Sequence, residues 1–341
     1  MIQEAISKLV QKQNLTLEEA ENAMNDIMEG KVTNAQIAAF LVSLRLKGET
    51  IGEITACAKI MRSKASTINP KVEHLVDTCG TGGDNSNTFN ISTAAAFVAA
   101  GAGASVAKHG NKSVSSKCGS ADVLKVLGVN IELQPKQVEK CIEEVGMGFM
   151  FAPLFHPAMK HALSARKEIG IRSVFNILGP LTNPANAKSQ LIGVFNPELL
   201  TIFAEVLKNI GISHAMIVHG SGLDEITVCG KTKVCELKNG SIRNYEINPS
   251  DFGIKLSSID QLKGGCAEEN SNIILEILKG GKGPKRDIVL LNAAGALFTA
   301  GIAKDFKHGI ELASKSIDSG NAMKVLKKLI EFTNKNAKQN N

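Results

Sequence analysis

The residues from Asp77 to Thr93, DTCGTGGDNSNTFNIST, combine a glycine-rich turn with the start of an alanine-rich run. Three of the four residues from 80 to 83 are glycines, which accept positive φ and leave backbone amides uncovered. The N-terminus of a helix attracts anions, so the spacing predicts a phosphate site at this turn. Asn90, Ser92 and Thr93 would then lie at the helix start. A tight turn followed by an ordinary N-cap is the alternative interpretation.

Two familiar nucleotide-binding motifs are excluded by their spacing. The dinucleotide fingerprint places a third glycine three residues after the second, where this chain has Asn85. A P-loop needs a glycine five residues before the glycine of Gly-Lys-Thr, and the triplet at 230–232 has Glu225 there. Any phosphate bound by the glycine-rich segment is therefore held by a different arrangement.

A second candidate segment, KHGNKSVSSKCGSADVLKVLG, runs from Lys108 to Gly128. It places Lys108, Lys112 and Lys117 among serines and small turn residues. Ammonium groups, hydroxyls and free amides all donate hydrogen bonds and suit a polyphosphate. The alternative interpretation is a solvated basic loop.

A third segment, from His156 to Pro184, carries Arg166, Lys167 and Arg172 around a predicted helix. An arginine here could pair bidentately with a carboxylate, which lysine does less well. A basic helix face without a ligand is the alternative.

The fourth candidate is the acidic pair Asp224 and Glu225, which follows a predicted strand in VHGSGLDEIT. Adjacent carboxylates repel each other and need solvent or a cation, and beside phosphate loops that cation would be magnesium. Two solvated turn acids are the alternative. Taken together, the four segments predict a magnesium-bound phosphorylated substrate beside a second, carboxylated one.

The chain around these segments predicts two domains. Residues 1–68 read as a small helical domain, because three helices begin with a capping box. Short strand-like runs alternate with helices after Asn69-Pro70, which predicts an α/β domain over 72–341 with a mainly parallel central sheet surrounded by helices. The predicted capping boxes are Thr16 with Glu19, Thr33 with Gln36, and Thr50 with Glu53.

Composition narrows the class of protein. The chain has 341 residues with 43% hydrophobic content, enough for a substantial core. Seven cysteines without a C-x-x-C pair indicate a reducing compartment, and no apolar signal or anchor is visible, so we expect a cytoplasmic protein without membrane attachment. The net charge of +6 is spread along the chain and aromatic content is 4%, which makes a nucleic-acid partner unlikely.

These motifs, in this order and through almost the whole chain, resemble the anthranilate phosphoribosyltransferase family of tryptophan biosynthesis. The resemblance implies a homodimer with a nucleoside phosphorylase-like fold, in which the segment of about 160–185 packs back on the helical domain. It also implies a pentosyltransferase that moves the phosphoribosyl group of 5-phosphoribosyl 1-diphosphate to the amine of anthranilate, with two Mg²⁺ ions per monomer.

The resemblance also implies roles for individual residues. Arg166, Lys108 and Asn111 would be catalytic, and Ser92, Asp224 and Glu225 would bind magnesium. Lys112 stands where the family more often has arginine. The residues that would contact anthranilate are Gly80, Asn111, Arg166, His109, His156 and Pro180. Those that would contact 5-phosphoribosyl 1-diphosphate are Gly80, Gly83, Asp84, Thr88, Asn90, Ile91, Ser92, Thr93, Lys108, His109, Gly110, Asn111, Lys112, Ser113, Val114, Ser115, Ser116 and Ser120.

Two other functions compete with this hypothesis. A nucleoside phosphorylase would share the fold and the glycine-rich turn, but the KHGN segment and the acidic pair argue against it. A non-catalytic relative that binds nucleic acid is permitted by the positive charge, and its binding would weaken steeply with salt.

Overall fold

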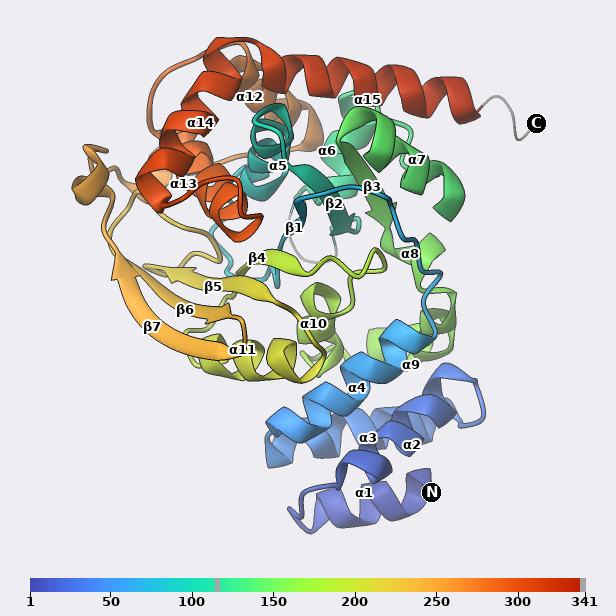
Figure 1. Ribbon diagram of the computed structural model, residues 1–341. Coiled ribbons are helices and arrows are strands. Elements are labelled where there is room, and N and C mark those ends of the chain that lie inside the picture. Colours follow the sequence, from blue (N-terminus) through green and yellow to red (C-terminus); the bar gives the residue numbers. More distant parts are fainter. Residues whose placement is uncertain (114–116, 338–341) are drawn as a thin grey trace.

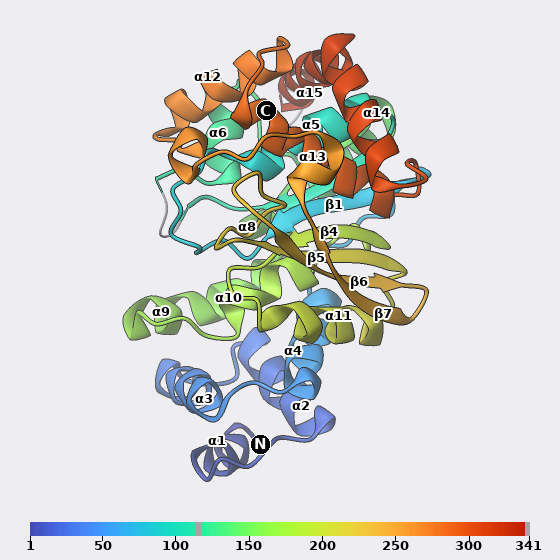
Figure 2. The same ribbon diagram turned by 90° about the vertical axis from the view of Figure 1, so that its left-hand side faces the viewer.

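The computed structural model describes residues 1–113 and 117–337, so the predictions for Val114, Ser115 and Ser116 lie outside the described residues. In Figure 1 a small helical bundle lies at the bottom, a sheet crosses the middle, and the C-terminal helices cover the top. The quarter turn of Figure 2 shows the same order of layers. The predicted fold class, a small helical domain with a large α/β domain, is confirmed.

The helical bundle forms because each of its helices has a strong start and one apolar face. All three predicted capping boxes are present, at Thr16, Thr33 and Thr50. The apolar face of the third helix is buried, and its Ile37 and Phe40 are 1% and 0% exposed. The bundle consists of α1 (Ile2–Val10), α2 (Leu17–Met28), α3 (Asn34–Lys47) and α4 (Ile51–Ser63).

A later segment of the chain returns to this bundle. The helix α9 (Lys160–Ile169) packs on α2 and α3, and its Ala162 and Ala165 are buried in the same core as the bundle helices. The Arg62 guanidinium of α4 donates to Asn186 Oδ1 at 2.7 Å, which also joins the bundle to the α/β domain. The domain boundaries at 68 and 72 stay a prediction.

The sheet has the order β3-β2-β1-β4-β5-β6-β7. Its first five members in space, from β3 to β5, are parallel, and β6 and β7 join antiparallel. Strand order reverses between β1 and β4, which is where an α/β sheet opens a crevice at its carboxyl edge. The strands are β1 (Leu75–Gly80), β2 (Ser105–Gly110), β3 (Met147–Phe151), β4 (Ser189–Gly193), β5 (His214–Gly220), β6 (Thr232–Lys238) and β7 (Ser241–Ile247).

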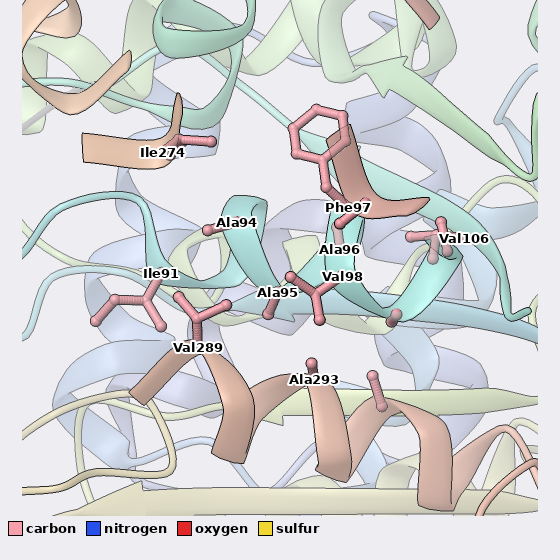
Figure 3. Close-up of a cluster of buried hydrophobic side chains, with 14 of the residues drawn as sticks. Ile91, Ala94, Ala95, Ala96, Phe97, Val98, Val106, Ile274, Val289 and Ala293 are labelled. Carbon is pink, nitrogen blue, oxygen red and sulfur yellow. The ribbon is translucent and has the colours of Figure 1, made fainter. Parts of the chain in front are cut away.

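Small side chains let the central helix α5 (Ile91–Gly101) lie deep in the core. Figure 3 shows Ala95 and Val98 of α5 beside Val289 and Ala293 of α13 (Pro284–Thr299), and these helices are in contact. Both helices cover one face of the sheet, and α11 (Leu199–Asn209) covers β5 and β6 on the other. The alanine run therefore positions the start of α5 at the crevice.

The other helices complete the layers. None of the helices in residues 1–113 and 117–337 has both the length and the apolar character needed to cross a membrane. They are α6 (Ser120–Val126), α7 (Pro135–Val145), α8 (Ala152–Phe155), α10 (Phe175–Leu178), α12 (Ala267–Leu278), α14 (Phe306–Asp318) and α15 (Asn321–Ala337).

Candidate functional site at the sheet crevice

The crevice between β1 and β4 brings together the glycine-rich turn and the acidic pair. The Gly82 amide donates to Asp224 Oδ2 at 2.8 Å, and Thr81 N donates to the Gly193 carbonyl at 2.9 Å. A Cβ at Gly80 would lie 2.7 Å from Asp224 Oδ2, so a side chain there would displace the acid. Glycine at this position is therefore required by the close approach of the carboxylate.

The loop from β1 to α5 folds around Asp84. Ser86 donates to both oxygens of the Asp84 carboxylate, through its hydroxyl at 2.8 Å to each. The Asp224 amide approaches Asp84 Oδ2 at 3.4 Å, so this acid lies next to the acidic pair. Thr88 forms an isolated antiparallel bridge with Lys263, which supports the loop from the side of α12.

The start of α5 leaves its backbone amides uncapped by Asn90, whose side chain makes no capping bond. Its amide nitrogen donates to the Cys118 carbonyl at 3.2 Å, and its oxygen accepts from Asn270 Nδ2 at 3.0 Å. Ile91 and Thr93 are 1% and 0% exposed, so their side chains face the core. The Ile91 amide donates to the Phe89 carbonyl at 2.7 Å, whereas the buried Thr93 hydroxyl has no hydrogen-bond partner among the described residues.

Lys108 lies under the crevice with 2% of its surface exposed. Its ammonium group donates to the Thr78 carbonyl at 2.6 Å and to Ser92 Oγ at 3.2 Å. Burial lowers the pKa of Lys108, while the charges of Asp77 and Glu225 act in the opposite direction. Lys108 therefore brings positive charge to the acidic pair and to the start of α5.

The carboxylates of Asp224 and Glu225 repel each other, and both are repelled by the carboxylate of Asp84. Burial and the charge of Asp84 raise the pKa of Asp224 to about 7. Burial and the charge of Asp224 raise the pKa of Glu225 well above its ordinary value, while Lys108 lowers it. This repulsion and the all-oxygen donor set fit a magnesium ion. In the described part of the chain, no three acidic, histidine or cysteine side chains form a cation cage, so water and phosphate would supply the other ligands.

Asp122, which sequence analysis missed, anchors the basic loop at both ends. Its Oδ2 accepts from Ser113 N at 3.0 Å and from Gly119 N at 2.9 Å. Ser120 donates to the Asn111 carbonyl at 3.4 Å, which closes the loop further. Lys112 is exposed and its ammonium lies 5.9 Å from the centroid of the Phe151 ring. Asp122 is residue N3 of α6, and its bond to the Gly119 amide is the local capping-box contact of that helix.

Arg166 lies on α9 with its guanidinium 4.9 Å from the centroid of the Phe175 ring. Burial lowers the pKa of Arg166, and no carboxylate in the described residues forms an ion pair with it. A partly buried guanidinium without an acid beside it is suited to an external carboxylate.

Two histidines lie against each other beside the turn that precedes β4. The rings of His109 and His156 are 5.0 Å apart, and His109 Nδ1 lies 3.3 Å from the Gly179 carbonyl. Burial lowers the pKa of His109 to about 3 and that of His156 to about 4, so both are neutral near pH 7. Both Nε2 atoms are buried and have no hydrogen-bond partner among the described residues. Two neutral rings, each with a buried Nε2 left unpaired in the described part of the chain, therefore lie against each other beside this turn. Pro180 is buried in the same turn.

Two further glycines, which the motifs did not identify, hold the acidic pair in place. A Cβ at Gly193 would come within 1.5 Å of the Asp224 carbonyl oxygen. A Cβ at Gly220 would lie 2.4 Å from the Glu225 carbonyl oxygen. Gly193 and Gly220 are the last residues of β4 and β5. A glycine at the end of a strand is too common a feature to identify these two positions from the sequence.

Comparison with known proteins identifies the family of the chain. The helical bundle domain of the glycosyl transferase family matches residues 3–65, and the a/b domain of that family matches residues 72–323. Over 335 residues the chain is 58% identical to an anthranilate phosphoribosyltransferase of Acetivibrio thermocellus, covering 98% of this chain and 97% of the relative.

Solved structures are similar over almost the whole chain. The anthranilate phosphoribosyltransferase of Thermus thermophilus is 42% identical, with a TM-score of 0.92 over 97% of this chain and 99% of that one. The enzyme of Saccharomyces cerevisiae in complex with PRPP and Mg is 29% identical, with a TM-score of 0.90 and 98% of both chains covered. Its complex with 4-fluoroanthranilate is 28% identical, with a TM-score of 0.89 and the same coverage. Both domain models and the high identity over almost the full length show that the chain belongs to the anthranilate phosphoribosyltransferases, pentosyltransferases of the glycosyl transferase family.

Proposed function

We propose that the protein transfers the phosphoribosyl group of 5-phosphoribosyl 1-diphosphate to the amine of anthranilate. The products are N-(5-phosphoribosyl)anthranilate and diphosphate, and the step belongs to tryptophan biosynthesis. The observation that carries the proposal is the contact of the glycine-rich turn with Asp224, whose neighbour Glu225 is stabilised in its charged form by the buried ammonium of Lys108. The yeast relative's complexes with PRPP and Mg and with 4-fluoroanthranilate support both substrates.

Donor groups for the phosphates come from the turn, the start of α5 and the basic loop. A backbone amide at positive φ, such as that of Gly83, can approach phosphate oxygens closely. Lys108 stabilises negative charge as it grows on the leaving diphosphate, because its ammonium is fixed by Thr78 and Ser92. Lys112 keeps the charge of the arginine more usual in the family but lacks its planar fork.

Magnesium is the proposed cofactor, with two ions per monomer and Ser92, Asp224 and Glu225 as ligands. When bound, Mg²⁺ supplies positive charge that disperses the charge of the leaving diphosphate. The carboxylates of Asp224 and Glu225 fit this role, since their mutual repulsion is relieved by a cation.

Anthranilate is proposed to bind through its carboxylate to Arg166 and to contact Asn111 and Gly80, with His109, His156 and Pro180 lining its path. The aromatic amine is weakly basic and uncharged at neutral pH, so it needs no strong general base. Holding the amine at the ribose carbon can supply several kcal/mol of the barrier. We infer direct displacement without a covalent intermediate, and a phosphoribosyl adduct trapped on a side chain would contradict it.

The reaction can be followed by the loss of anthranilate fluorescence, because the chain contains no Trp and has little background. We expect decay that requires anthranilate, 5-phosphoribosyl 1-diphosphate and Mg²⁺ together. Replacing Asp224 and Glu225 by Asn and Gln should depress turnover and weaken the magnesium dependence, whereas Arg166→Gln should raise the KM for anthranilate. Activity that needs only phosphate and thymidine would instead identify a nucleoside phosphorylase.

A homodimer and a cytoplasmic location are also proposed. The helical bundle exposes the apolar side chains of Val10 and Leu46 at 68% and 78%, which a partner subunit would cover. Light scattering of the purified protein tests this directly, and a monomer at micromolar concentration would contradict it.

A further inference from the structure

Arg172 connects the linker between α9 and α10 to the glycine-rich turn. Its Nη2 donates a hydrogen bond to the Gly83 carbonyl, although the two residues are 89 positions apart in the sequence. The linker follows α9, which packs on the helical bundle, whereas Gly83 follows the central strand β1. One exposed side chain thus joins the two parts of the chain that meet at the crevice.

The same guanidinium contacts a second loop. It lies over the Phe195 ring, 4.4 Å from the ring centroid, just after the end of β4. The Phe195 amide in turn donates to Thr81 Oγ1 at 3.0 Å. Arg172, Phe195, Thr81 and Gly83 therefore close a ring of contacts, which we call the Arg172 bracket.

The turn needs such a restraint because of its composition. Gly82 and Gly83 have φ of 64° and 77°, and glycine adopts mirror-image conformations at little cost, so an unrestrained pair can turn its peptide groups over. The C=O and the following N–H of a trans peptide point in opposite directions. Fixing the Gly83 carbonyl on Arg172 therefore also fixes the Asp84 N–H, facing away from the guanidinium.

Arg172 and Gly83 also fit together sterically. A Cβ at Gly83 would lie 2.7 Å from Arg172 Nη2, so the absence of a side chain at 83 is what allows the guanidinium to reach the carbonyl. On its other side the turn is held by Asp224 through the Gly82 amide. Since Asp224 is a proposed metal ligand, Arg172 still holds the Gly83 carbonyl when that carboxylate turns to a cation.

We propose that Arg172 is a positioning residue for 5-phosphoribosyl 1-diphosphate, which holds the turn of residues 82–84 in the orientation that receives the diphosphate. Arg172 acts through the backbone and does not touch the substrate. The proposal rests on the function proposed above. Without the bracket, a smaller fraction of the protein has the competent turn, and the apparent affinity falls by that fraction.

The test compares four variants in steady-state kinetics. Arg172→Ala should raise the KM for 5-phosphoribosyl 1-diphosphate about tenfold, the size expected for a lost charge-assisted hydrogen bond, with kcat and the KM for anthranilate nearly unchanged. Arg172→Lys keeps a donor and should recover part of the loss. Phe195→Leu removes no charge but loosens the bracket, so it should raise the same KM. Lys167→Ala removes an exposed charge from the neighbouring helix end and should change nothing.

Hydrogen exchange of the free protein adds a measurement that needs no activity. Amides of residues 82–84 should exchange faster in Arg172→Ala than in the wild type, while the melting temperature stays close to that of the wild type, because Arg172 is exposed. An unchanged KM for 5-phosphoribosyl 1-diphosphate in Arg172→Ala would overturn the proposal. It would also be overturned if Arg172→Ala raised this KM and Phe195→Leu did not, because Arg172 would then act on the substrate itself. If the wild type lacked the transferase reaction, the proposed function would fail, and unchanged exchange in Arg172→Ala would separately refute the bracket.

Discussion

Gly193 and Asp224 touch through their backbones, and a Cβ built on Gly193 would come within 1.5 Å of the Asp224 carbonyl oxygen. The end of β4 thus sets where the acidic pair lies. Because the obstacle is backbone, it cannot be relieved by turning a side chain.

Gly193→Ala should therefore move the acidic pair and lower kcat/KM by about a hundredfold, as expected for a displacement of about 1 Å at a reacting site. Turnover as a function of magnesium concentration is the measurement. Gly52→Ala in α4 is the matched control, because its Cβ would meet nothing closer than 3.9 Å. Normal activity in Gly193→Ala would show that the acidic pair tolerates displacement.

The pKa of Asp224 predicts a pH-dependent stability in the absence of metal. Its value is raised from 3.8 to about 7, so ionising it costs more in the folded than in the unfolded protein. Stability is therefore lost as pH rises from about 4 to about 7. Asp224→Asn does not ionise, so its melting temperature should exceed that of the wild type by a few degrees at pH 8 and converge toward it near pH 4.

Thermal unfolding in a chelator measures this difference across the pH range. Added Mg²⁺ should then stabilise the wild type at pH 8 more than the variant. A gap in melting temperature that does not change with pH would mean that Asp224 titrates normally.

Asp122 offers a test of the basic loop. Asp122→Ala leaves the amides of Ser113 and Gly119 without this acceptor, and each charge-assisted bond is worth roughly 1.5–3 kcal/mol. We expect the KM for 5-phosphoribosyl 1-diphosphate to rise by one to two orders of magnitude, with a smaller rise in Asp122→Asn. Equal defects in both variants would argue for a general loss of α6 rather than a loop anchor.

Asn270 supports the start of α5 from α12. It is 2% exposed, donates to Asn90 Oδ1 at 3.0 Å and accepts from Gly265 N at 2.8 Å. Asn270→Ala should cost roughly 1–3 kcal/mol of unfolding free energy, because two polar groups lose their partners. Urea unfolding measures this cost. Glu268→Gln, an exposed change on the same helix, should stay within about 0.5 kcal/mol of the wild type.

Local signals explain which parts of this fold could be predicted. The capping boxes at Thr16, Thr33 and Thr50 act within four residues, so their pattern alone identifies the helix starts. The alternation of strands with helices along the chain predicted the mainly parallel sheet. It did not predict the antiparallel pairing of β6 and β7, because periodicity does not specify which strands pair.

Some residues of the candidate site could also be predicted from local sequence, and others could not. Glycine-rich and basic segments were visible because several unusual residues stand together. Gly193, Asn270 and the contact of Arg172 with Gly83 join residues brought together only by tertiary structure. Such partners leave no mark on the local pattern, even where their geometry is as restrictive as at Gly193.

Because α9 packs on the helical bundle, the position of Arg166 depends on how the bundle lies against the α/β domain. Arg166 belongs to a helix seated on α2 and α3, whereas the glycine-rich turn is fixed to β1. The gap between the proposed acceptor and donor is thus a spacing between two bodies of the protein. Substitutions at the junction of Arg62 with Asn186, which are 124 positions apart along the chain, would change that spacing and leave every proposed substrate contact chemically intact.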